Sequence, residues 1–187
     1  MKTKLVILCA LLISVLSIYA QDDNDEKKSK IWYGPKVGVD IPVSMLIETP
    51  ELITDQMKGN YQVGGFVRFG DKLFLQPEVY YASYKYNATS YEYLKVPVML
   101  GLRILDIGLV SLHATGGLDY TKQLVTGSTG VLNWQVGACV GVLGFLTADL
   151  RYTFQKNDLS GVQQIENLIA NGGMVNLTVG LKLRAGK

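Results

Sequence analysis

Apolar and polar side chains alternate at every second residue over most of this chain, from Val37 to Arg184. Neighbouring side chains of a β-strand point to opposite faces of the sheet, so a period of two predicts strands with one apolar and one polar face. Eight separate segments carry this pattern, and one apolar position from each is Val37, Val63, Val79, Leu100, Leu112, Val136, Leu150 and Val179. After the first twenty residues no stretch approaches the roughly 18 consecutive apolar residues of a spanning helix. The pattern therefore predicts an all-β chain of eight strands.

The connections between the eight segments differ in length. The expected short turns lie near Gly70, Asp106 and Gly144, and the expected longer loops are residues 44–59, 87–90, 121–131 and 157–171. An even number of antiparallel strands of about ten residues, with short turns at one end, is typical of a transmembrane barrel whose chain ends both lie in the periplasm. We therefore predict an eight-stranded antiparallel up-and-down transmembrane β-barrel.

Eight alternating strands also fit a soluble barrel of lipocalin type, in which the apolar face points inward and the polar face meets water. A water-facing surface should be rich in Lys and Glu. The polar positions here hold mainly Gly, Ser, Thr, Asn and Gln with a few charges of both signs, and the chain is 48% hydrophobic and 18% charged. Such side chains suit the narrow interior of an eight-stranded barrel. The membrane barrel is the main prediction, and a periplasmic lipocalin-like ligand-binding barrel is the alternative.

The charged residues at the polar positions are expected to face the lumen and to form a structural network: Lys36, Asp40, Arg68, Glu78, Lys95, Arg103, Asp119, Asp149, Arg151, Lys182 and Arg184. An unpaired charge in a narrow interior costs several kcal/mol, so interlocking ion pairs are predicted. If the two strands around residue 87 share one inward face, Glu78 lies beside or diagonally next to Lys95. Pro77 and Pro97 lack an N–H group in a barrel without edges, so a β-bulge is expected in this hairpin.

The first thirty residues are expected to lie outside the barrel. Residues 1–20 combine Lys2 and Lys4 with an apolar run and a small residue at Ala20, which predicts a cleaved signal peptide. Residues 21–30 are a flexible charged leader, and residues 31–187 form the barrel domain, which we predict to reside in the bacterial outer membrane. Loss of residues 1–20 leaves 16 basic and 16 acidic residues. A chain without excess positive charge is not expected to bind nucleic acid. Cys139 is then the only cysteine, so no internal disulfide is expected.

Candidates for chemistry are few. His113, the only histidine, is predicted to share the inward face with Ser111 and Asp119. Asp119 lies six residues further along the strand, about 20 Å away, so the three do not form a nucleophile and its base. Metal-ligand spacing is absent, and no cofactor is expected. The sequence therefore predicts a protein that is not an enzyme, with a small outer-membrane lipid-modifying enzyme as a further alternative.

The hairpin around residue 87 carries a family resemblance. The segments FLQPEVYYASYKY and YEYLKVPVMLGLRI resemble the paired third and fourth strands of the PorT-like outer-membrane β-barrel family, in which a QPE strand precedes a YL-x-x-P strand. The resemblance implies a small eight-stranded barrel, of the OmpX and OmpA type, in the envelope of a Gram-negative bacterium. The family's namesake is associated with an apparatus that exports proteins across the outer membrane, so a link to secretion is a further implication.

The two longest loops are the candidate interaction surfaces. Residues 44–59 and 157–171 each hold enough apolar side chains for a turn or two of helix, and Val162, Ile165 and Leu168 would share one helical face. A lumen filled by side chains should not pass solutes by diffusion, which argues against a porin. The predicted function is a non-enzymatic, monomeric outer-membrane scaffold or interaction protein. Its expected partners are outer-membrane lipid and envelope or secretion proteins.

Overall fold

The computed structural model describes residues 31–43, 60–86, 89–154 and 173–185. The predicted signal peptide and leader, the loop at 44–59 and the loop at 157–171 lie outside these residues. No helix among the described residues is both long and apolar enough to cross a membrane.

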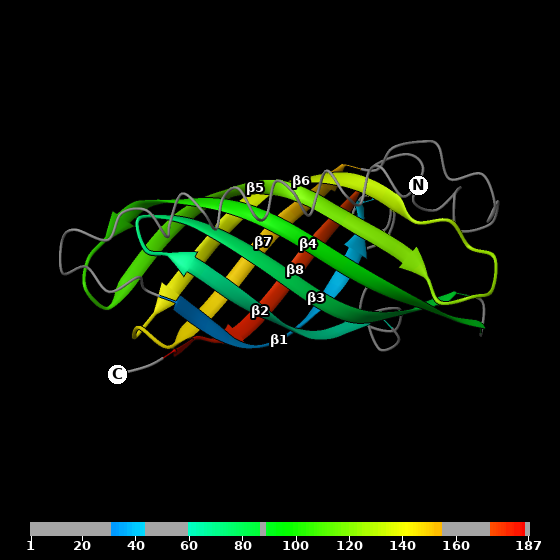
Figure 1. The fold of residues 1–187 in the computed structure, drawn as a ribbon, viewed down its shortest axis with the longest axis horizontal. Coiled ribbons are helices and arrows are strands. Elements are labelled where there is room, and N and C mark those ends of the chain that lie inside the picture. Colours follow the sequence, from blue (N-terminus) through cyan, green and yellow to red (C-terminus); the bar gives the residue numbers. More distant parts are fainter. Residues whose placement is uncertain (1–30, 44–59, 87–88, 155–172, 186–187) are drawn as a thin grey trace. The chain divides into compact units, whose positions relative to one another are not determined.

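Antiparallel strands make up almost all of the described chain (Figure 1). Their bounds are β1 (Ile31–Pro42), β2 (Tyr61–Gly70), β3 (Leu73–Tyr86), β4 (Thr89–Asp106), β5 (Val110–Gln123), β6 (Val131–Val142), β7 (Leu146–Phe154), β8 (Met174–Leu181) and β9 (Leu183–Arg184). From β1 to β8 each strand pairs with the next one in sequence, and β8 pairs with β1, which closes the sheet. The two residues of β9 continue β8 along β1 after an interruption at Lys182. The predicted all-β, eight-stranded antiparallel up-and-down barrel is therefore confirmed.

The alternation places the polar face inside the barrel and the apolar face outside. Met99 and Leu100 are neighbours in β4, yet Met99 is 0% exposed and Leu100 is 55% exposed. The same contrast separates buried Gln135 from exposed Trp134 and Val136 in β6. This is the opposite of a lipocalin-type barrel, whose apolar face lines the interior. The lipocalin-like alternative is therefore wrong, because the large apolar side chains surround the barrel instead of filling it.

Glycines make room for the large side chains of the lumen. Five inward glycines lie directly opposite a large residue of the neighbouring strand, in the pairs Gly64–Tyr80, Gly101–Phe74, Gly117–Met99, Gly137–Arg151 and Gly180–Lys36. A Cβ added at Gly101 would lie 2.0 Å from the Phe74 ring. Alternating small and large residues is how the interior of a small barrel is filled. The glycines of the polar face are therefore a packing requirement of the closed lumen.

The expected bulge is not in the hairpin that contains Pro77 and Pro97. The β3–β4 register stays constant from Leu73 to Tyr86, so that prediction is wrong. Each proline instead interrupts one ladder locally: the β2–β3 pairs stop opposite Pro77, the β3–β4 pairs stop opposite Pro97, and both resume in the same register. A missing N–H group removes a hydrogen bond without adding a residue, so no shift is needed.

A register shift does occur further along β4, against β5, between Arg103 and Leu105. Up to Arg103 the odd-numbered residues of β4 face inward, whereas beyond the shift Asp106 pairs with the inward Ser111. The extra residue, Ile104, thus turns Asp106 towards the lumen, on the same side as Arg103. Bulges near the rim of a barrel commonly re-aim a side chain in this way.

The glycine packing makes a prediction that two adjacent residues of β5 test. A Cβ at Gly117 would lie 2.1 Å from the Val98 carbonyl oxygen and 2.9 Å from the Met99 Cα, whereas one at Gly116 would meet nothing closer than 3.9 Å. We expect Gly117→Ala to lower the free energy of unfolding by about 1–3 kcal/mol. Gly116→Ala should leave it nearly unchanged. Urea unfolding of the detergent-folded barrel, followed by tryptophan fluorescence, measures both, and equal effects of the two changes would contradict the packing argument.

Candidate functional site

Two carboxylates and two cations interlock in the middle of the lumen. The Lys36 Nζ lies 2.9 Å from Glu78 Oε1 and 2.7 Å from Asp149 Oδ2. Arg151 donates to both oxygens of Glu78 at 2.7 Å and to Asp149 Oδ1 at 2.8 Å. Tyr80 donates to Glu78 Oε2 at 2.7 Å. Because each carboxylate contacts both cations and all four charged side chains are buried, this central cluster is fully ion-paired.

A second cluster lies nearer the long-loop end of the lumen and is centred on Asp40. Lys95 Nζ lies 2.6 Å from Asp40 Oδ2, and the side chains of Tyr84 and Asn176 also donate to this carboxylate. Asp119 is buried close by, accepts a hydrogen bond from Thr121 Oγ1 at 3.1 Å, and keeps Oδ1 without a partner among the described residues. The second cluster therefore contains one well-paired carboxylate and one that is only partly satisfied.

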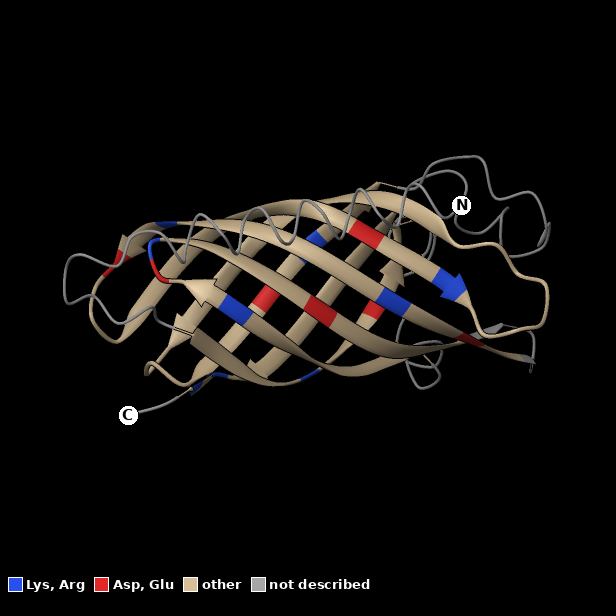
Figure 2. Cartoon of the chain, in the orientation of Figure 1, with Lys and Arg blue, Asp and Glu red and all other residues tan. Residues whose placement is uncertain are grey.

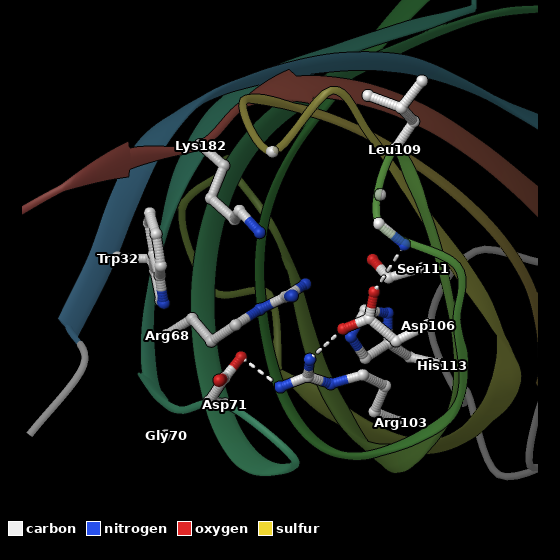
Figure 3. Close-up of a pocket in the computed structure, with 13 residues that line it drawn as sticks. Trp32, Arg68, Gly70, Asp71, Arg103, Asp106, Leu109, Ser111, His113 and Lys182 are labelled. Carbon is white, nitrogen blue, oxygen red and sulfur yellow. Dashed lines mark hydrogen bonds and ion pairs between the residues drawn. The ribbon is translucent and has the colours of Figure 1, made fainter. Parts of the chain in front are cut away.

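A third group of charges surrounds a cavity of about 110 Å³ at the end of the barrel with the short turns. Arg103 lies between Asp71 and Asp106 and forms an ion pair with each (Figure 3). The Gly108 N–H donates to Asp106 Oδ1 at 3.1 Å, which fixes this carboxylate. Arg68 and Lys182 also line the cavity. The three groups together run along the lumen, and Figure 2 shows charged positions both in the middle of the strands and towards the ends.

The structure separates the predicted lumenal residues by depth. Those that are buried are Lys36, Asp40, Arg68, Glu78, Lys95, Asp119, Asp149 and Arg151. Arg103 and Lys182 are half-buried at the short-turn end, and Arg184 is exposed in β9. Lys95 pairs in register with Tyr80 and so lies diagonally to Glu78, but its ion pair is with Asp40.

Sequence reasoning missed several polar side chains that complete these clusters. Tyr84 and Asn176 hold Asp40, and Gln76 donates to Glu78. The alternation of inward and outward residues already placed Gln76 and Asn176 on the inward face. Their positions in the strands could therefore have identified them as parts of these clusters. Asp106 could not have been found in this way, since the bulge at Ile104 reverses its expected side.

The three residues considered for catalysis do not assemble. Asp119 belongs to the second cluster, whereas Ser111 and His113 line the cavity at the short-turn end. The His113 Nδ1 lies 3.3 Å from the Cys139 carbonyl oxygen, and its ring packs edge-on against Phe74. Within the described part of the chain, neither residue is hydrogen-bonded to an acidic side chain, and no group of acidic, His or Cys residues could hold a metal ion. A serine becomes a nucleophile when a positioned base accepts its proton, and Ser111, His113 and Asp119 are not arranged in this way.

Comparison with known proteins relates the chain to others by fold. No protein-family model and no curated protein sequence matches it. The N-terminal β-barrel domain of Pseudomonas aeruginosa OprF has a TM-score of 0.46 at 11% identity and covers 83% of this chain and 100% of its own. The Yersinia pestis outer membrane protein Ail, in a phospholipid bilayer nanodisc, has a TM-score of 0.47 at 14% identity, covering 83% and 100%. The designed barrel TMB2.3 scores 0.46 at 12% identity, covering 87% and 100%.

All three TM-scores lie below 0.5 and all three identities are 14% or lower, so the barrel architecture rests on the strand pairing of this chain and not on these similarities. The resemblance of the β3–β4 hairpin to the PorT-like family is not confirmed by a family match and stays a prediction.

The central cluster predicts a large effect of one conservative change. Glu78→Gln removes the charge that faces both Lys36 and Arg151 and leaves these buried cations with Asp149 alone. We expect a loss of about 3–5 kcal/mol in the free energy of unfolding, since breaking a buried ion pair strands a charge. The matched control is Glu92→Gln, the same change at an exposed position of β4. Urea unfolding in detergent measures both, and a loss below about 1 kcal/mol for Glu78→Gln would contradict the ion-paired lumen.

Proposed function

We propose that this chain is a non-enzymatic integral outer-membrane β-barrel protein that serves as a scaffold or interaction protein of the bacterial envelope. The observation that carries the proposal is the inverted barrel, with an apolar exterior around an ion-paired interior. Water-exposed apolar patches on soluble monomers rarely exceed a few hundred Å². Here every strand except β5 contributes exposed large apolar residues, for example Val37, Val63, Val79, Leu100, Val136, Leu150 and Val179.

A lipid bilayer is the solvent that such an exterior fits. Closed barrels are the β-structures that can span hydrocarbon, because every backbone N–H and C=O group is paired within the sheet and no edge remains. The remaining strand, β5, contributes half-exposed Leu112 and Leu118 to the same outer face. The bacterial outer membrane is the compartment in which single-chain transmembrane barrels of eight strands are found.

The filled lumen supports a scaffold over a pore. Arg151, Tyr80 and Lys36 are among the largest fully buried side chains, and all three point into the centre of the barrel. Eight strands enclose only enough space for such side chains. Diffusion of solutes through the central cluster would require breaking several buried ion pairs at once, so channel activity is not part of the proposal.

The partners are proposed to be outer-membrane lipid around the barrel and envelope proteins at the long-loop end. Residues 44–59 and 157–171 are the candidate binding segments on grounds of sequence, and both lie outside the described residues. The hairpin resemblance suggests that the envelope partner belongs to a protein secretion apparatus. The barrel itself is proposed to be monomeric, since its sheet closes on itself without a second copy.

Single-cysteine labelling tests the membrane placement. In a Cys139→Ser background, Leu100→Cys should react with a membrane-soluble thiol reagent, whereas Met99→Cys, one residue away on the inward face, should not. Thr126→Cys, in the exposed β5–β6 loop, should react on intact cells with an impermeant reagent. Rapid labelling of Leu100→Cys from water would contradict a lipid-facing exterior.

Cross-linking on intact cells tests the partner segment. Replacing residues 157–171 by a Gly-Ser linker of equal length should leave the heat-modifiable gel migration of a folded barrel and abolish cross-linking to an envelope protein. Replacing residues 124–129 in the same way is the control, because this loop is not a proposed binding segment. Cross-linking that survives the first replacement, or is lost in both, would contradict the assignment.

A further inference from the structure

The cavity at the short-turn end is lined by charged residues that do not belong to the two ion-paired clusters deeper in the lumen. It is lined from β1, β2, β4, β5 and β6, from Lys182 between β8 and β9, and by three short turns. Its mouth carries the partly exposed side chains of Asp71 and Asp106. Figure 3 shows Arg68 and Lys182 pointing into the open space, with Arg103 below them and Ser111 and His113 across. A solute in the periplasm would therefore meet two positive side chains inside a recess.

The charges around this cavity are unevenly matched. Both carboxylates of the lining, Asp71 and Asp106, are held by Arg103. Among the described residues no carboxylate pairs with Arg68 or Lys182. Arg68 contacts Gln76 Oε1 at 2.5 Å, Cys139 Sγ at 3.4 Å and the Phe74 ring at 3.9 Å.

Arg68 is buried without a carboxylate partner among the described residues. Arg68 is only 2% exposed, and a buried cation without a counter-charge costs several kcal/mol, of which a ring face recovers a part. Lys182 Nζ lies 4.6 Å from the Trp32 ring centroid, and no side-chain hydrogen bond or ion pair joins it to another described residue. An anion between the two cations would satisfy both.

The cavity also offers unused hydrogen-bond donors. The hydroxyl of Ser111 belongs to the cavity lining, and the buried Nε of Arg103 has no hydrogen-bond partner among the described residues. Lysine and arginine together with a hydroxyl form a donor set that suits the several acceptor oxygens of an oxyanion. A volume of about 110 Å³ fits one such ion with a few waters, whereas drug-sized ligands occupy roughly 300–1,000 Å³.

We propose that this cavity is a binding site for a single phosphate-class oxyanion, held between Arg68 and Lys182. The bulge at Ile104 contributes to the site because it turns Asp106 inward, where this carboxylate pairs with Arg103. Arg68 and Lys182 then remain as the cations that can bind the ligand. The phosphate group can belong to a free periplasmic anion or to the headgroup of a lipid at the inner rim of the membrane.

Calorimetric titration of the full mature barrel in phosphate-free maltoside detergent with inorganic phosphate tests the proposal. We expect saturable binding that Lys182→Gln weakens about tenfold, the loss of one charge-assisted hydrogen bond. Lys182 has no ion pair to break, so this variant should fold. The control is Lys72→Gln, which removes the same charge at the same end of the barrel but not from the cavity lining.

Two results would overturn the proposal: no saturable binding by the unmodified barrel, or equal weakening by Lys72→Gln and Lys182→Gln. Repeating the titration in phosphatidylglycerol nanodiscs identifies the source. If inorganic phosphate binds equally well in these nanodiscs, the site is for a free oxyanion. If its binding is lost only in these nanodiscs, the lipid phosphate occupies the site. Neither readout depends on the proposed protein partner, so the two proposals can fail separately.

Discussion

The ion pairs between Glu78, Asp149, Lys36 and Arg151 are the interaction on which the barrel depends. Closing eight amphipathic strands with their apolar face outward forces the side chains of the polar face into a lumen too narrow for bulk water. A charge there is stable only with a partner within contact distance. The partners come from β1, β3 and β7, which meet only when the sheet has closed, so correct closure and charge neutralisation are one event.

The limited volume of the lumen is the second constraint, and inward glycines make room for the large side chains beside them. Arg151 and Lys36 can reach Glu78 because Gly137 and Gly180 lie beside them in the neighbouring strands. The space beside these glycines is filled by the large side chains opposite them, so no continuous channel remains. The charge network and the glycine pattern are thus two parts of one packing solution.

The short-turn end follows a different rule. The β-bulge at Ile104 breaks the alternation, brings Asp106 to Arg103 and opens a recess in which Arg68 and Lys182 have no acidic partner in the described chain. The centre of the lumen is neutralised internally, whereas this end is left with positive charge that faces solvent. Such a contrast separates a structural network from a surface suited to a ligand, and it is the basis of the binding site proposed at the short-turn end.

The sequence by itself determined the number of strands and the side of each residue. The alternation was sufficient because a strand has only two faces, so parity places Glu78, Lys95 and Asp149 inside without knowledge of the fold. Only the tertiary structure decided which charges meet, since Glu78 and its partner Lys36 are 42 residues apart and their contact depends on the register around the whole barrel. It also decided the place of the bulge: the adjacent apolar residues Ile104 and Leu105 interrupt the alternation, but only the pairing with β5 distinguishes an inserted residue from the end of the strand. The partnership of Arg103 with Asp106, and the cavity beside it, follow from that single shift in register.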